Sequence, residues 1–366
     1  MKNIFTLILT LIFLINISMA NGADCVDNSC QSLFSDFRSE ELVRLTITTN
    51  INRLLENRKK ATYQNATVEW KSANGNTVTL QADIRARGKY RNRVCDFPPI
   101  KLKFSKKELS EMGYSSYNKM KLVTHCIDGG EEGNQNVIKE YLAYRMYNEI
   151  TDYSFRVQLV EVEYIDAQHP ETSDIRYGII IEHKKEMAAR LNADIKKDLY
   201  NPNVEQINAS IENKMALFNY MLGNEDYSTV AYKNIEWIQD KTTGKLIPVP
   251  YDFDFSGFVN PSYARVPSSS GHKSNKERKF LGLPVNDNIF NANIAKFLAK
   301  EKKIVQLVRK NRSLNLEQRL EAISYIRSFY TKLRAVQKND SGSLYQSILQ
   351  VDVPVEKEGY YGHPLY

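Results

Sequence analysis

Four side chains within one segment have the types and spacing that metal-assisted phosphoryl transfer requires. Asp226 follows the end of an apolar helix, Asn234 precedes a strand, and Asp252 and Asp254 end the next strand. Carboxylate and amide oxygens suit a hard cation such as Mg²⁺ or Mn²⁺. A carboxylate upstream of such ligands can orient or deprotonate a hydroxyl. We therefore predict that Asp226 is catalytic and that Asn234, Asp252 and Asp254 bind metal, although Asp254 could instead cap the following turn.

The elements that must position these residues can be predicted from the local sequence. An apolar helix should end at Gly223, because glycine is the usual residue just past a helix C-terminus. Segments 235–238 and 246–251 are predicted to be two strands joined by a turn. This hairpin should bring Asn234 close to Asp252. Paired aspartates at a strand end also occur in calcium sites, so a calcium-stabilised structural protein is the weakest alternative.

A basic loop and a lysine-bearing strand lie upstream and could hold the phosphates of a nucleotide. The loop, residues 87–93, begins with Arg87, and the strand over 100–104 alternates so that Lys101 and Lys103 share one face. Lysine neutralises phosphate oxygens as a point charge, and the N–H groups of a loop can approach them. Arg87 and either Lys101 or Lys103 are thus predicted to bind phosphate. The alternative is a solvated basic hairpin, since runs of charge usually face water.

Two glutamates occupy positions that a kinase uses around its nucleotide. Glu140 lies in an amphipathic helix predicted over 136–150, where it could pair with the phosphate-binding lysine. Glu182 ends a strand predicted over 175–182 that leads directly into a helix, as does the connection between kinase lobes that meets adenine. Both are predicted to belong to the nucleotide site, although a carboxylate near a helix start is favourable in any protein.

The order of these motifs resembles the core of the spore-coat CotH kinase family of secreted atypical protein kinases. The resemblance rests on Gly223-Asn224-Glu225-Asp226, Asn234 and Pro250-Tyr251-Asp252-Phe253-Asp254, and it covers residues 78–257. It implies an α+β, two-lobed atypical protein-kinase-like fold with a strand-rich N-terminal lobe and a mainly helical C-terminal lobe. It also implies ATP as cofactor and a Ser or Thr hydroxyl of an exported protein as acceptor. The upstream loop is poorer in glycine and serine than the family pattern.

A non-catalytic surface or adhesion protein with the same fold is the alternative function. Segment 258–279 is rich in Ser, Pro and Gly and is basic, so it could form a lid that binds a partner, a glycan or an acidic peptide. Metal-dependent binding of a nucleotide would distinguish the enzyme from the adhesion protein.

The N-terminus predicts export and the composition predicts a globular chain. A basic start, an apolar run and the end Ser18-Met19-Ala20 predict a secretory signal peptide cleaved after Ala20, which leaves no membrane anchor. The protein would then be secreted, periplasmic or extracellular. We expect a signal peptide over 1–20, a loose segment over 21–41, one kinase domain over 42–350 with lobes over 42–182 and 183–350, and a tail over 351–366.

The net charge indicates which kinds of ligand the protein could bind, and the cysteine content indicates an oxidising compartment. The 366 residues are 42% hydrophobic and 25% charged, and the net charge of +7 suits an anionic substrate such as a nucleotide. No clustering of basic and aromatic residues indicates nucleic-acid binding. Four cysteines in an exported chain predict two disulfides, and Cys25–Cys30 with Cys95–Cys126 is the favoured of three pairings. Their spacing does not suit a zinc site.

Overall fold

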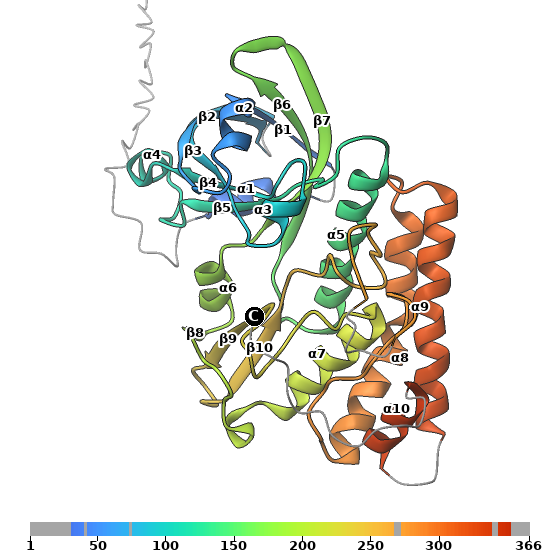
Figure 1. Cartoon of the computed structure of the whole chain (residues 1–366). Coiled ribbons are helices and arrows are strands. Elements are labelled where there is room, and N and C mark those ends of the chain that lie inside the picture. Colours follow the sequence, from blue (N-terminus) through green and yellow to red (C-terminus); the bar gives the residue numbers. More distant parts are fainter. Residues whose placement is uncertain (1–30, 40–41, 73–74, 267–271, 339–342, 353–366) are drawn as a thin grey trace, which may run out of the picture.

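The computed structural model describes residues 31–39, 42–72, 75–266, 272–338 and 343–352. The predicted signal peptide and the predicted Cys25–Cys30 disulfide therefore lie outside the described residues. The chain is α+β, with a strand-rich N-terminal part and a mainly helical C-terminal part, as the sequence predicted (Figure 1). Within the described ranges, no helix has the length and apolar character needed to cross a membrane.

The strands of the N-terminal part form a closed barrel. In order around the barrel they are β1 (Val43–Thr49), β2 (Gln64–Lys71), β3 (Thr77–Ala86), β4 (Ile100–Phe104), β5 (Lys119–Val123), β7 (His169–Ile181) and β6 (Val157–Asp166). Neighbouring strands are antiparallel, except that β1 and β6 run parallel. Strand β4 alternates as predicted: Ile100, Leu102 and Phe104 are buried in the barrel and its two lysines point outward.

Short helices lie before or between the strands of the barrel, and one of them is in the predicted basic loop. They are α1 (Leu33–Phe37), α2 (Ile51–Glu56), α3 (Arg91–Val94) and α4 (Lys106–Glu111). A disulfide joins Cys95, directly after α3, to Cys126, which follows β5, and confirms the predicted pairing. The backbone N–H groups of Asp96 and Phe97 both donate to the carbonyl of Cys126. The basic loop is therefore anchored at its end to the neighbouring strand.

Helix α5 (Glu132–Ile150) connects β5 to β6 but packs with the C-terminal part. It begins at Glu132, earlier than predicted, where Gly133 passes so close to the preceding segment that a Cβ would lie 2.6 Å from the carbonyl oxygen of Ile127. Its buried residues, among them Val137 and Met146, join the larger of two hydrophobic cores. The smaller core fills the barrel. Because α5 is shared, its side chains can reach both parts of the protein.

The C-terminal part combines a small antiparallel sheet with helices. Its elements are α6 (Lys184–Arg190), β8 (Ala193–Lys196), the 3-10 turn η1 (Val204–Gln206), α7 (Ala209–Leu222), β9 (Ile235–Asp240), β10 (Leu246–Pro250), α8 (Asp287–Lys310), α9 (Leu316–Gln337) and α10 (Leu344–Asp352). The sheet has the order β10–β9–β8. Figure 1 shows α7 between this sheet and the long α8–α9 pair.

Local chemistry explains the two elements that carry the predicted site. Helix α7 ends at Gly223, which has a φ of 61° and so adopts the left-handed conformation. A Cβ at this position would lie 2.2 Å from the Tyr325 hydroxyl oxygen, so only glycine fits. The β9–β10 turn is closed by Asp240 Oδ1, which accepts hydrogen bonds from the backbone N–H groups of Thr242 and Thr243. The hairpin therefore forms as predicted.

Candidate nucleotide and metal site

The open end of the β9–β10 hairpin brings Asn234 and Asp252 to the same place. The carbonyl of Asn234 accepts a hydrogen bond of 3.0 Å from the N–H of Tyr251, the residue before Asp252. Asn234 has a φ of 51° and Asp252 a φ of 65°. Asparagine and aspartate are the non-glycine residues that tolerate this left-handed conformation best. Both residues thus leave the strand conformation at the same end of the hairpin.

The side chain of Asn234 holds Asp226. Its Nδ2 donates to the Asp226 carbonyl at 2.6 Å and to Asp226 Oδ2 at 2.8 Å. Lys233 forms an ion pair with the other carboxylate oxygen of Asp226. Burial raises the pKa of Asp226, Lys233 opposes this rise, and the Asp252 carboxylate adds to it. Asp226 is therefore a fixed carboxylate with an increased affinity for protons, as a general base needs.

An arginine that the sequence analysis did not single out stands at the centre of the site. Arg91, the first residue of α3, donates from Nε to Asp254 Oδ2 at 2.7 Å. Its Nη2 donates to Glu140 Oε2 at 3.0 Å and to Asp252 Oδ1 at 3.3 Å. The hydroxyl of Tyr263 also donates to Asp254, at 3.3 Å. We call Glu140, Asp252 and Asp254 the carboxylate cluster.

The carboxylate cluster carries more negative charge than Arg91 neutralises. Burial would lower the pKa of Arg91, but Asp254 and Glu140 outweigh it and raise that pKa well above its ordinary value. Burial raises the pKa of Glu140, and it raises the pKa of Asp254 to about 6. The raised pKa favours a protonated Glu140, and the remaining carboxylates, Asp252 and Asp254, together still carry more negative charge than Arg91 neutralises.

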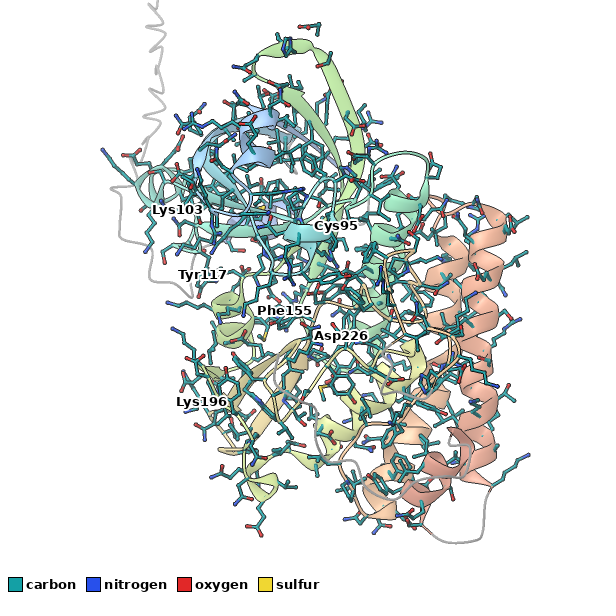
Figure 2. All side chains as sticks on the ribbon, viewed as in Figure 1. Cys95, Lys103, Tyr117, Phe155, Lys196 and Asp226 are labelled. Atoms are coloured by element: carbon teal, nitrogen blue, oxygen red, sulfur yellow. A yellow bond between two sulfur atoms is a disulfide. The ribbon has the colours of Figure 1, made fainter. Side chains whose placement is uncertain are left out.

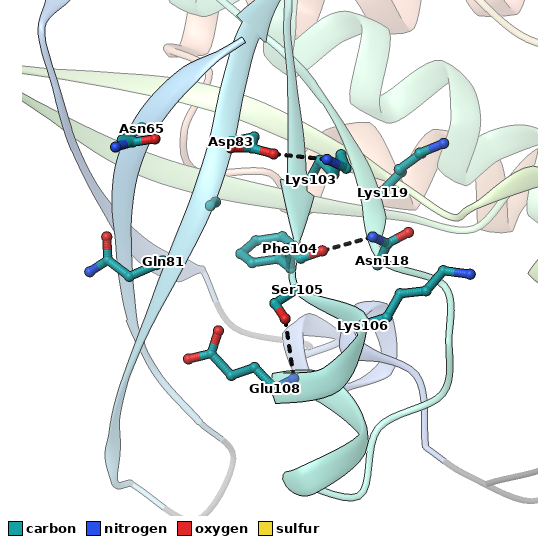
Figure 3. A pocket seen from close by; sticks show the side chains of 11 residues that line it. Asn65, Gln81, Asp83, Lys103, Phe104, Ser105, Lys106, Glu108, Asn118 and Lys119 are labelled. Carbon is teal, nitrogen blue, oxygen red and sulfur yellow. Dashed lines mark hydrogen bonds and ion pairs between the residues drawn. The ribbon is translucent and has the colours of Figure 1, made fainter. Parts of the chain in front are cut away.

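The structure separates Lys103 from this site. Lys103 forms a 2.9 Å ion pair with Asp83, which raises the pKa of the lysine, and it lines a separate hollow of about 630 Å³ with Lys119 (Figure 3). Lys103 and Asp226, both labelled in Figure 2, lie well apart. The two lysines that the sequence left as alternatives thus differ in position, and the structure does not bring Lys103 to the carboxylate cluster.

Lys121, on the neighbouring strand β5, has the position and the burial expected of a lysine that binds phosphate. It is paired in register with Lys101, so both point out from the barrel on the same face. Its Nζ lies 5.4 Å from the centre of the Tyr251 ring, next to Asp252 in the chain. Burial, and after it the like charges of Arg87 and Lys184, lower the pKa of Lys121 to about 8 against the opposing effect of Glu236 and Asp252.

Arg87, Lys101 and Lys121 therefore form one basic group on the outer face of the barrel, and Lys121 brings this group next to Tyr251 at the end of the hairpin. Burial lowers the pKa of Lys101, Tyr63 opposes the shift, and like-charged neighbours that include Arg87 add to it. The sequence signal that indicates Lys121 is the alternation of the strand that carries it. Lys119 and Lys121 alternate along β5 just as Lys101 and Lys103 do along β4.

Glu182 lies at the predicted connection between the two parts, but its side chain is used there. It is buried, and it accepts bonds of 2.9 and 2.8 Å from the guanidinium of Arg190 and one of 2.9 Å from the N–H of Arg156. This carboxylate holds the end of β7 against α6. Its side-chain oxygens are thus bonded within the protein, and a role of Glu182 in nucleotide binding stays a prediction.

The residues present fit a hard cation that shares its ligands with phosphate. Among the described residues, no three His, Cys, Asp or Glu side chains are placed to hold a metal alone. The Asp252 side chain is nevertheless 42% exposed, and among the described residues no hydrogen bond uses Asn234 Oδ1. Glu140 Oε1 is buried without a hydrogen-bond partner. Mg²⁺ is usually bound by one or two carboxylates together with phosphate oxygens.

Comparison with known proteins adds a remote structural likeness. No model of a known protein family matches the sequence, and no curated protein matches it. Among solved structures, the chain is similar to the Helicobacter pylori proinflammatory kinase CtkA, with 9% sequence identity and a TM-score of 0.36. The match covers 66% of this chain and 97% of that chain. A likeness at this level carries no functional argument, so the function must be argued from the site itself.

Proposed function

We propose that this protein is a metal-dependent phosphotransferase that moves the γ-phosphate of ATP to a Ser or Thr hydroxyl of an exported protein. The observation that carries the proposal is the meeting of Asp226, Asn234 and Asp252 at the open end of the β9–β10 hairpin. An acid held by an amide, beside an exposed carboxylate, is the arrangement that a kinase uses to position a hydroxyl and a metal-bound nucleotide. The resemblance to the CotH family, based on the same residues, points the same way.

Each residue of the site would have a distinct role. Asp226 would orient the acceptor hydroxyl and accept its proton, which its raised pKa favours. Asn234 Oδ1 and Asp252 would hold Mg²⁺ or Mn²⁺. The bound cation would neutralise charge on the transferred phosphoryl group. Asp254 would reach the cation only by giving up Arg91, so its first role would be to fix that arginine.

The basic group on the barrel would bind the phosphates. Lys121 with Lys101 and Arg87 would neutralise their oxygens, and most of the rate enhancement would come from this electrostatic positioning. Arg91 and Glu140 would replace the lysine–glutamate ion pair that aligns a kinase site. The Cys95–Cys126 disulfide supports a protein made for an oxidising compartment.

Some of the basic residues that an adhesion protein would need for binding a partner are already bonded within this protein. Arg278 is buried, donates to the carbonyls of Met221 and Tyr325, and stacks 3.9 Å from the centre of the Tyr325 ring. Lys276 forms a 2.6 Å ion pair with Glu321. Part of the predicted basic lid is therefore used to hold the fold together.

The proposal is tested by phosphate transfer from labelled ATP in the presence of Mn²⁺. The acceptors are the protein itself and a mixture of Ser- and Thr-containing exported proteins. Asp252→Asn should reduce incorporation by about 100-fold or more, as loss of a metal ligand does. Asp194→Asn, which changes an aspartate with 63% side-chain exposure, is the matched control and should transfer normally.

Two results would contradict the proposal. Equal incorporation by the wild type and Asp252→Asn would remove the role given to Asp252. Metal-dependent binding of ATP without transfer to any acceptor would favour the non-catalytic alternative.

A further inference from the structure

A second polar hollow lies away from the candidate site, where the barrel meets the C-terminal part. It has a volume of about 430 Å³ and is lined by four arginines, Arg38, Arg145, Arg156 and Arg190. They come from four places: the end of α1, helix α5, the start of β6 and the end of α6. None of them belongs to the site proposed above. A hollow of this volume is large enough for a small-molecule ligand.

Two of these arginines are held by the protein. Arg190 makes a bidentate pair with buried Glu182 and donates to the carbonyls of Asp152 and Ser154, so it forms a fixed wall. Arg145 donates from Nη1 to the Tyr141 hydroxyl at 2.6 Å, and its guanidinium lies 5.7 Å from the centre of that ring. The conformation of Arg145 is thus restrained, while its remaining N–H groups stay available.

The other two arginines, Arg38 and Arg156, are solvent-exposed and are not fixed by the protein. Neither Arg38 nor Arg156 has a side-chain hydrogen bond or an ion pair with any of the described residues. Burial lowers the pKa of Arg156, and the like charges of Arg190 and Arg38 lower it further, against the opposing effect of Glu182 and Glu186. Glu182 and Glu186 offset only part of this like-charge repulsion, and an anion between the arginines would offset more of it.

The acidic residues that line the hollow, Glu149 and Asp152, neutralise only part of this charge. Glu149 is engaged from outside by Lys303 at 2.8 Å and by Lys300 at 3.5 Å. Asp152 is exposed, and its carboxylate makes no ion pair with any described residue. The lining therefore keeps an excess of guanidinium groups.

We propose that Arg38, Arg145 and Arg156 form a binding site for a phosphoryl group. Planar guanidinium groups bind phosphate through paired, charge-assisted hydrogen bonds, and three of them from separate elements can surround its oxygens. The phosphoryl group could belong to a free small molecule or to a phosphorylated side chain. A ligand here would contact α1, α5 and β6 together and so would stabilise the contact between the two parts of the protein.

The probes are inorganic pyrophosphate and a short phosphoserine peptide, each titrated calorimetrically into the full protein with EDTA present. Without a divalent cation, nucleotide-site binding contributes little. The test variant is Arg38→Ala/Arg156→Ala, which removes no side-chain hydrogen bond or ion pair with the described residues and should fold normally. The control is Arg44→Ala, which removes an exposed arginine paired with Glu161 on the barrel.

The wild type and Arg44→Ala should bind at least one probe, and the double variant should bind it about 100-fold more weakly, as expected for two lost charged contacts. Weaker binding of the probe by Lys121→Ala, with normal binding by the double variant, would place the probe at the nucleotide site and overturn the proposal. Preference for pyrophosphate indicates a free small molecule, and preference for the peptide indicates a phosphorylated side chain. Lack of binding of both probes, or equal binding by wild type and double variant, would overturn the proposal.

Discussion

The Nε atom of Arg91 lies 2.7 Å from Asp254 Oδ2, so a residue of the barrel is bonded to the segment that follows β10. The same guanidinium contacts Glu140 on α5, the helix shared by both parts. The end of α3 is itself fixed by the disulfide at Cys95. Arg91 is therefore the polar connection through which the barrel, α5 and the predicted metal ligands keep their relative positions.

Loss of Arg91 should destabilise the protein strongly. Arg91→Ala leaves Glu140 and Asp254 buried without a cation, which should lower the free energy of unfolding by about 3–5 kcal/mol. The free energy of unfolding of Arg91→Lys should lie between those of the wild type and Arg91→Ala. A lysine keeps the charge but cannot bond several carboxylates at once as the guanidinium does. Urea unfolding measures both. Arg93→Ala, an exposed change in the same helix, should leave the midpoint unchanged, and an equal effect of Arg91→Ala and Arg93→Ala would contradict the prediction.

Lys121 and Lys103, which both point outward from the barrel, should contribute differently to nucleotide binding. Lys121→Ala should weaken binding of ATP with Mn²⁺ about 10- to 100-fold, because one charged contact with phosphate is lost. Lys103→Ala should have little effect, because Lys103 is paired with Asp83 in another hollow. Calorimetric titration measures both dissociation constants. A larger effect from Lys103→Ala than from Lys121→Ala would show that the assignment is reversed.

Nucleotide binding should weaken as the pH rises through about 8. Burial lowers the pKa of Lys121 to about 8, so the free protein loses this charge above that pH and must take up a proton to bind phosphate. The dissociation constant should therefore rise between pH 8 and 9, and proton uptake should appear as a dependence of the binding heat on the buffer. Lys121→Arg, which stays charged, should flatten the profile. A profile of the same slope in this variant would exclude Lys121 as the cause.

The lowered pKa of Lys121 should have the opposite effect on folding, because it increases the stability of the folded protein as the pH rises. Between pH 8 and about 10, the unfolded chain binds more protons at this position than the folded protein does. This group therefore favours the folded state increasingly as the pH rises through that window. Replacing it with Lys121→Met should remove that part of the pH dependence of unfolding, which urea titrations at pH 7.5 and 9.5 can measure.

Asp226 should control the chemical step and leave nucleotide binding intact. Asp226→Asn should reduce kcat by about 10²- to 10⁴-fold with little change in the dissociation constant for ATP. Lys233→Ala removes the ion pair that lowers the pKa of Asp226, so the acidic limb of the pH–rate profile should move to higher pH. An unchanged kcat in Asp226→Asn, or a limb that moves to lower pH in Lys233→Ala, would contradict the role of Asp226 as base.

The disulfide should stabilise the barrel. It closes a loop with a sequence separation of 31 and fixes the end of α3. Replacing both cysteines, Cys95→Ser/Cys126→Ser, should lower the free energy of unfolding by about 2–4 kcal/mol and lower Tm. Reducing agent should lower the Tm of the wild type in the same way and leave that of the double variant unchanged. A wild-type Tm that does not respond to reduction would contradict this prediction.

Patterns of short range made much of the architecture predictable from sequence. The alternation of β4, the glycine that ends α7 and the Asp240 turn of the hairpin each depend on neighbours a few residues away. For the same reason the hairpin with Asn234 and Asp252 at its open end was expected. Helix α5 was predicted as a helix, but its start at Glu132 depends on contacts of Gly133 with a preceding segment.

The sequence by itself determined the order of the chemically active residues along the chain, favoured the Cys95–Cys126 pairing among three, and through its family resemblance implied the α+β class. Only the tertiary structure decided which cations meet which carboxylates. It selected Arg91 from a run of arginines, placed Lys121 near the hairpin and Lys103 away from it, and used Glu182 to bind Arg190. The physical reason is that a charge finds its partner through long-range packing of the chain, whereas turns, caps and alternation depend on adjacent residues.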